Sequence, residues 1–108
     1  MPEPPEDLTL SRAAGFVTVR FTPRESYIRY LLYRESADGY ATLLAAFEGA
    51  DAALYTDDVS GLSGTVSYYV IAVHPQITVE GAPLAGPASK KASLFLYAHD
   101  SFLKSPEN

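Results

Sequence analysis

The stretch that most constrains this chain is residues 65–75, which read Thr-Val-Ser-Tyr-Tyr-Val-Ile-Ala-Val-His-Pro. It is rich in β-branched and aromatic residues, contains no glycine, and ends at Pro75, which has no backbone N–H to donate to a sheet. Read with the two-residue period of a strand, residues 66–73 contain one distinctly polar side chain, Ser67. A strand that is apolar on both faces is normally covered on both faces. The stretch therefore predicts a central β-strand that ends at Pro75.

Alternation of apolar and polar residues predicts a second, half-buried strand over residues 16–21. Asp38-Gly39 is a strong turn signal. The prolines and glycines of residues 75–87 predict a long loop. Residues 40–47 favour a strand but also suit one helical turn. The remaining short strands are expected over residues 8–10, 27–34, 53–56 and 89–98.

Short strands separated by regular turns predict an all-β protein, a seven-stranded antiparallel immunoglobulin-like β-sandwich. Residues 8–10, 16–21 and 53–56 should form one sheet, and the other four strands the second sheet. The side chains expected in the core are Leu10, Val17, Val19, Phe21, Ile28, Tyr30, Leu32, Tyr55, Leu62, Tyr68, Val70 and Ala72.

Length and charge bound the domain organisation and the class of partner. The chain has 108 residues, enough for one domain, and we expect a linker over 1–7, the domain over 8–98, and a linker or tail over 99–108. The acidic opening Pro-Glu-Pro-Pro-Glu after Met1 is not a signal peptide and suggests a domain of a longer protein. A net charge of -5 argues against nucleic acid, and no apolar run is long enough to span a membrane.

Two groups of polar residues contain the residue types of a metal-binding or catalytic site. Asp57 and Asp58, with Asp51 nearby, suggest a hard-cation site, but no regular loop supplies the six or more oxygens that calcium requires. Ser60, His74 and Asp58 contain the residue types of a nucleophile–base–acid set, but no nucleophile elbow surrounds a serine. We therefore expect no enzyme activity, no cofactor and no metal.

The ordered series of strand residues resembles a fibronectin type III domain of the divergent bacterial kind. The pieces that carry the resemblance are residues 15–23, 30–34 with Tyr40, 55–57, 61–62 and 68–73. Phe21 stands where the family usually has tryptophan. The resemblance assigns Tyr68 to the family's tyrosine corner, in which the hydroxyl bonds back to the chain.

The resemblance implies a spacer or binding module without chemistry of its own, in a surface, periplasmic or secreted protein. We therefore expect a non-catalytic protein-interaction or spacer module. The alternative is an ancillary domain of a carbohydrate-active enzyme, with Tyr33, Tyr69 or Tyr97 as a stacking platform for sugars. Gene context or a glycan array would separate the two.

The predicted partner-binding residues lie on the outer face of the second sheet. If Tyr30, Leu32, Tyr68 and Val70 face the core, their neighbours face outward. The outward residues are Leu31, Tyr33, Tyr69, Ile71 and Val73, joined by Phe95 and Tyr97 or by Leu94 and Leu96. Monomeric proteins seldom leave such an apolar patch exposed to solvent. We expect a second copy or a neighbouring domain, and the alternative is local cover by the 75–87 loop or by Phe102-Leu103.

Overall fold

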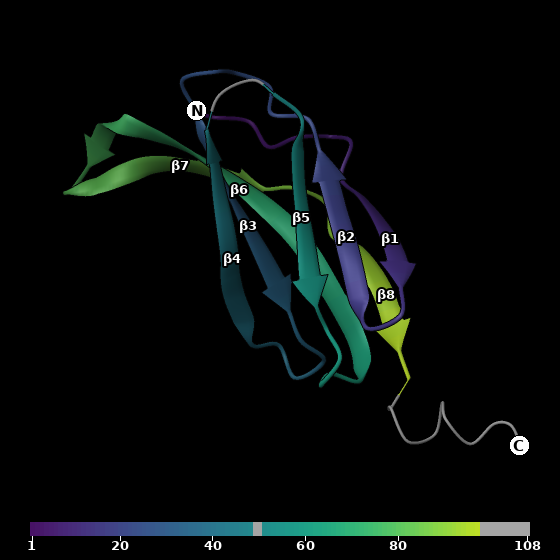
Figure 1. Ribbon diagram of the computed structural model, residues 1–108. Coiled ribbons are helices and arrows are strands. Elements are labelled where there is room, and N and C mark those ends of the chain that lie inside the picture. The colour runs from purple at the N-terminus through teal and green to yellow at the C-terminus, as the bar shows by residue number, and fades with distance from the viewer. Residues whose placement is uncertain (49–50, 98–108) are drawn as a thin grey trace, which may run out of the picture.

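The computed structural model describes residues 1–48 and 51–97, and in these ranges the protein is all-β, without a helix. Two antiparallel sheets face each other across one hydrophobic core (Figure 1). The first sheet has the order β1-β2-β5, with β1 at Thr9–Ala13, β2 at Phe16–Phe21 and β5 at Ala53–Asp58. The second has the order β4-β3-β6-β7, with β8 also paired to β6. Its strands are β4 (Ala41–Glu48), β3 (Arg29–Glu35), β6 (Gly64–Val79), β7 (Ala82–Ala88) and β8 (Ala92–Leu96).

The predicted division of the strands between the two sheets is confirmed, and so is the strand reading of residues 40–47. The predicted bounds of β2 are also confirmed. Apart from β6, four strands start or end later than expected. β1 continues to Ala13 and β5 to Asp58, β3 starts at Arg29, and β4 starts at Ala41. The described residues contain eight strands instead of the seven expected.

The extra strand lies in the C-terminal part of the chain, where one strand was expected and the structure has β7 and β8. The sequence predicts a single strand over residues 89–98. In the structure, two strands, β7 and β8, pair with β6, and residues 89–91 separate them. At the interruption, Ser89 stays attached to β6, because its N–H donates to the Val70 carbonyl (2.8 Å) and its hydroxyl accepts from the Val70 N–H (2.9 Å). β7 and β8 are therefore two segments of one bent edge.

The predictions that the central strand ends at Pro75 and that residues 75–87 form a loop are wrong. β6 continues to Val79 and forms a hairpin with β7 that projects from the body of the sandwich (Figure 1). The β6–β7 register shifts between His74 and Thr78, so Pro75 lies in an irregular stretch where its missing N–H interrupts no regular ladder. Residues 74–84, here called the arm, extend beyond Val73, where β3 stops pairing with β6.

The turn of the arm explains why these residues form a hairpin. Val79 pairs with Ala82, which leaves a two-residue turn of Glu80 and Gly81. Both turn residues have positive φ angles, 53° for Glu80 and 86° for Gly81. Two successive positive φ angles define a type I′ turn, whose twist matches that of two antiparallel strands. The glycine therefore acts as a hairpin residue rather than as a loop breaker.

The core is formed by the inward residues of both sheets. Nine of the twelve predicted core residues are buried, and Leu10, Tyr55 and Leu62 are partly buried against the same cluster. Phe21 is 3% exposed, and its ring meets Phe47 edge-on with centroids 5.4 Å apart. The sequence reading did not include Ala53, Val59, Val66, Val73 and Leu96, which are also buried.

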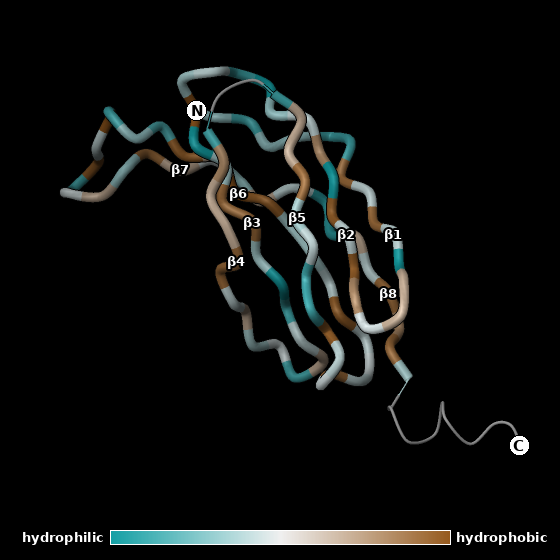
Figure 2. The backbone as a smooth tube through the Cα atoms, in the orientation of Figure 1, coloured by the Kyte–Doolittle hydropathy of each residue, from teal (hydrophilic) through white to brown (hydrophobic). Residues whose placement is uncertain are grey.

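The hydropathy of the second sheet changes along its strands. Figure 2 shows β3 changing from hydrophobic to hydrophilic along its length, and its polar end holds Arg34 and Glu35. At the other end of β3, the Tyr30 hydroxyl accepts hydrogen bonds from the backbone N–H groups of Arg24 and Glu25 (2.8 and 2.9 Å). This contact fixes the connection between β2 and β3.

Residues 1–7 form no strand but pack on the sandwich. Pro2 and Pro5 are buried, and the Arg24 guanidinium lies 3.3 Å from the Glu3 carboxylate and 3.2 Å from that of Glu6. The Pro2 carbonyl lies against Gly86 of β7, where it leaves no room for a Cβ atom. The predicted tail at 99–108, with Phe102 and Leu103, lies outside the described residues.

Candidate functional site

The predicted partner-binding residues come from two neighbouring strands of the second sheet. β3 and β6 are antiparallel, and their register places Leu31 opposite Ile71 and Tyr33 opposite Tyr69. These four side chains are partly exposed. Val73 is only 8% exposed, so it contributes little to the surface. The structure thus brings four of the five residues together at the centre of the outer face.

The two tyrosines stack on each other. The rings of Tyr33 and Tyr69 lie 5.3 Å apart with an interplanar angle of 13°. The ammonium group of Lys91 lies over the Tyr69 ring, 5.9 Å from its centroid. Because β6 lies between β3 and the segment that carries Lys91, these two neighbours approach Tyr69 from opposite sides. Both faces of the Tyr69 ring are therefore occupied.

Charged pairs border the apolar centre. Arg29 Nε lies 2.8 Å from Glu48 Oε2 at one end, and Lys91 Nζ lies 2.7 Å from Glu35 Oε1 at the other. The interaction with Glu35 raises the pKa of Lys91, so this residue stays charged. On β4, Leu43 pairs with Tyr33 and is 52% exposed, which widens the apolar centre. The face therefore has an apolar centre and charged pairs at both ends.

Phe95 and Tyr97 lie apart from that centre. The sequence left open whether Phe95 and Tyr97 or Leu94 and Leu96 face outward. Phe95 and Tyr97 are exposed (53% and 66%), while Leu96 is buried and Leu94 packs against the core. The rings of Phe95 and Tyr97 form an edge-on pair, 5.2 Å apart. A polar row separates them from Tyr69, because Ser67 pairs with Ser93 and the two hydroxyls are hydrogen-bonded (2.8 Å). They form a separate, smaller patch.

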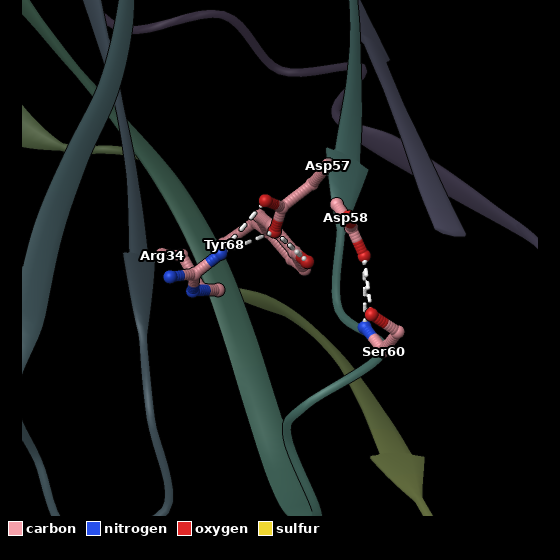
Figure 3. A network of polar contacts seen from close by, with 5 residues as sticks. All are labelled: Arg34, Asp57, Asp58, Ser60 and Tyr68. Carbon is pink, nitrogen blue, oxygen red and sulfur yellow. Dashed lines mark hydrogen bonds and ion pairs between the residues drawn. The ribbon is translucent and has the colours of Figure 1, made fainter. Parts of the chain in front are cut away.

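A buried polar network connects the two sheets (Figure 3). Asp57 on β5 accepts two hydrogen bonds from Arg34 Nη1 on β3 (2.7 and 2.9 Å) and one from the Tyr68 hydroxyl on β6 (2.6 Å). The Asp57 side chain is 5% exposed. Burial, and then the hydrogen bond to Asp57, raise the pKa of Tyr68 well above its ordinary value. The Tyr68 hydroxyl was expected to bond back to the chain, and its partner is this carboxylate.

The network joins a residue of the first sheet to two of the second. Both carboxylate oxygens of Asp57 are engaged by Arg34 and Tyr68. The neighbouring Asp58 points the other way and accepts from the Ser60 N–H (3.0 Å) and hydroxyl (2.8 Å), as Figure 3 shows. Both bonds lower the pKa of Asp58, and the bond from the Ser60 N–H has the larger effect. Asp57 and Asp58 thus belong to different environments, and the described residues contain no cluster of three or more metal-ligating side chains.

His74, the candidate base of the nucleophile–base–acid set, contacts an aromatic ring. Its ring lies 5.4 Å from that of Tyr27, at the base of the arm. Its Nδ1 atom is buried and has no hydrogen-bond partner within the described ranges. A catalytic histidine base is oriented by an acid at the second ring nitrogen, and His74 has none there.

An apolar groove of about 770 Å³ lies at the end of the sandwich where the β1–β2 turn and the end of β8 meet. Phe16, Leu62 and Tyr97 contribute to its walls. The side chains in its lining that carry polar groups are Arg12, Ser60 and Tyr97, and Arg12 already donates to the Phe95 carbonyl (2.8 Å). The rest of the lining is apolar.

Sequence comparisons add no relative. A scan of protein-family models finds no match, and a search of curated proteins finds none either. No helix among the residues described by the structure has the length and apolar character needed to cross a membrane. The resemblance to fibronectin type III domains stays a prediction that rests on the residue pattern.

Proposed function

We propose that the chain is a non-catalytic protein-interaction or spacer module of a larger surface or secreted protein. Its fold would be an immunoglobulin-like sandwich of the fibronectin type III kind, with β7 and β8 together in the place of the last strand. The division into a β1-β2-β5 sheet and a β4-β3-β6-β7 sheet supports this assignment.

The observation that carries the function is the outer face of the second sheet. Leu31, Ile71, Tyr33 and Tyr69 form two adjacent cross-strand pairs there, with exposed Leu43 beside them. The ion pairs of the rim and the apolar centre together suit a protein surface, because interfaces combine an apolar centre with polar groups around it. The partner is a second copy, another protein or a neighbouring domain.

The test is a double substitution at the centre of this face. Ile71→Asp with Tyr69→Ser should leave the circular dichroism spectrum unchanged, lower association measured by light scattering, and abolish binding of a hydrophobic dye. Leu54→Asp is the matched control, because Leu54 is 52% exposed and pairs with Arg20 on the first sheet. A wild-type chain that is monomeric at high concentration and binds no dye would contradict the proposal.

The alternative is a glycan-binding ancillary domain of a carbohydrate-active enzyme, and of its three candidate tyrosines Tyr69 has the least support. A sugar that stacks on an aromatic residue needs a free ring face. Tyr69 has Tyr33 on one side and Lys91 on the other. A glycan array tests the alternative directly: binding that disappears in Tyr33→Ala or Tyr69→Ala would favour it, and a blank array favours the protein-interaction module.

A further inference from the structure

The arm presents an unpaired sheet edge outside the body of the sandwich. Residues 76–83 are all exposed, and Ile77 and Val79 remain 46% and 53% exposed. The pairing of β3 with β6 ends at Val73, so the β3 side of residues 74–79 has no strand beside it in the described part of the chain. An isolated two-stranded hairpin is marginally stable in water and gains from a third strand.

The two edges of the arm differ in their capacity to accept a strand. The β7 edge carries Pro83 and Pro87, and proline on an edge blocks pairing because it has no N–H. The β6 edge from Gln76 to Val79 has no proline and no charged residue. A further strand would therefore add to β6 and not to β7.

The backbone of Thr78 is directed toward that open edge. Val79 and Ala82 enclose the two-residue turn, so they are the hydrogen-bonded pair that closes the hairpin. Hydrogen-bonded and non-hydrogen-bonded pairs alternate in an antiparallel ladder, and the next pair is Thr78 with Pro83, which has no N–H. The N–H and carbonyl of Thr78 consequently point away from β7, where a strand from outside could bond to both.

The sequence of this edge is self-complementary. Residues 76–80 read Gln-Ile-Thr-Val-Glu, an alternation of polar and apolar side chains that is the same in both directions from Thr78. In an antiparallel pair with a two-fold axis at Thr78, Ile77 lies opposite Val79 of the second copy, and Gln76 opposite its Glu80. Apolar side chains then meet apolar ones, and no like charges are opposed.

We propose that the β6 edge of the arm pairs with the same edge of a second copy of this chain. The two Thr78 residues exchange their N–H and carbonyl hydrogen bonds across the two-fold axis, and the paired arms form a four-stranded sheet. The contact is small, so it forms a weak, concentration-dependent dimer. It is separate from the outer face and does not depend on the function proposed above.

Disulfide crosslinking tests the geometry at its centre. The chain contains no cysteine, so Thr78→Cys introduces a single thiol. A hydrogen-bonded antiparallel pair places its Cα atoms about 5.5 Å apart, inside the range of about 4.4–6.8 Å that a disulfide spans. Thr78→Cys should form covalent dimers at least about ten-fold faster under mild oxidation than Ser11→Cys, an exposed position on β1. Equal rates would overturn the proposal.

A second pair of variants tests the backbone bonds. Thr78→Pro removes the outward N–H without removing a bond to β7, and Thr78→Val keeps the backbone and the β-branched shape. Both are made in the Ile71→Asp, Tyr69→Ser background, so that association through the outer face does not contribute. By analytical ultracentrifugation at high concentration, Thr78→Val should dimerise like its parent and Thr78→Pro should be monomeric with an unchanged melting temperature.

Introducing Ile71→Asp and Tyr69→Ser into the Thr78→Cys chain separates this contact from the outer face. Crosslinking should persist in the combined variant. If the outer-face substitutions abolish crosslinking, the copies associate through that face and the arm contact is wrong. The arm contact is also wrong if, in the outer-face background, Thr78→Pro and its parent sediment alike.

Discussion

The body of the sandwich and the arm share one strand, β6, but are stabilised by different means. In the body, the inward residues of β6 from Val66 to Ala72 are at most 1% exposed and lie between two sheets. In the arm, the same strand has Ile77 and Val79 about half exposed and depends on the turn at Glu80 and Gly81 for its shape. One continuous strand can therefore be a core element at one end and a local hairpin at the other.

Phe21→Ala should give the largest effect and expose this difference directly. Phe21 is 3% exposed and packs against Phe47 and Tyr30, so its truncation should lower the free energy of unfolding by about 3–5 kcal/mol. Ile77→Ala in the arm should change it by no more than about 0.5 kcal/mol. Urea unfolding followed by circular dichroism measures both, and similar losses would mean that the arm belongs to the cooperative core.

Gly86→Ala tests the place where the arm joins the body. A Cβ at Gly86 would meet the Pro2 carbonyl, so the substitution should lower the free energy of unfolding by about 1–3 kcal/mol and make residues 1–7 more sensitive to proteolysis. Gly61→Ala is the matched control, since a Cβ there has no neighbour within 4 Å. If the two variants behave alike, the contact between Pro2 and Gly86 has no energetic role.

Tyr68→Phe tests the buried network of the body through its pH dependence. Loss of the bond to Asp57 should cost about 1 kcal/mol at neutral pH. The folded state raises the pKa of Tyr68 above its ordinary 10.0, so above pH 10 the unfolded chain loses this proton while the folded chain keeps it. The free energy of unfolding then falls with rising pH, by up to about 1.4 kcal/mol per pH unit.

The Tyr68→Phe variant should lose this part of the alkaline slope in chemical unfolding measured at several pH values. Tyr40→Phe, at a residue that is 72% exposed, should keep it. A slope that is unchanged in Tyr68→Phe would show that Tyr68 does not hold its proton more tightly in the folded state.

Glu80→Asn should have the smallest effect, confined to the tip of the arm. Glu80 has a φ of 53°, a region that costs most residues about 1–2 kcal/mol and that asparagine adopts more readily. The substitution should slow hydrogen exchange at Val79, whose N–H bonds across the turn, by less than about ten-fold and leave global unfolding unchanged. Exchange of the core residues at the wild-type rate is the internal control.

The sequence could predict those parts of the fold in which side-chain alternation decides the strand. β2 alternates cleanly, and its bounds were predicted correctly. The end of β6 could not be predicted from composition, because Pro75 is a strand breaker only where a regular ladder needs its N–H. Glu80-Gly81 is a hairpin turn whose signal is weaker than Asn-Gly or Asp-Gly, and the prolines and glycines around it predict a loop instead.

The same limit applies to the candidate site. Period-two alternation predicts that Leu31, Tyr33, Tyr69 and Ile71 lie on one face. It does not predict the strand register that makes them direct cross-strand pairs. The buried network was missed although a signal was present. Arg34 follows Tyr30 and Leu32 at inward spacing, and Asp57 follows Ala53 and Tyr55 in the same way. Two opposite charges at inward positions of facing sheets predict a buried pair.

The register shift between His74 and Thr78 has a consequence for how this protein can change over time. A one-residue insertion or deletion within Gly64–Val73 would turn the inward side chains of β6 on one side of the change outward, and so would remove them from the core. Beyond the shift, the ladder of the arm is already out of step with that of the body. Length variation is therefore tolerated at the tip and excluded from the body, and the arm is where a new contact can arise without loss of the fold.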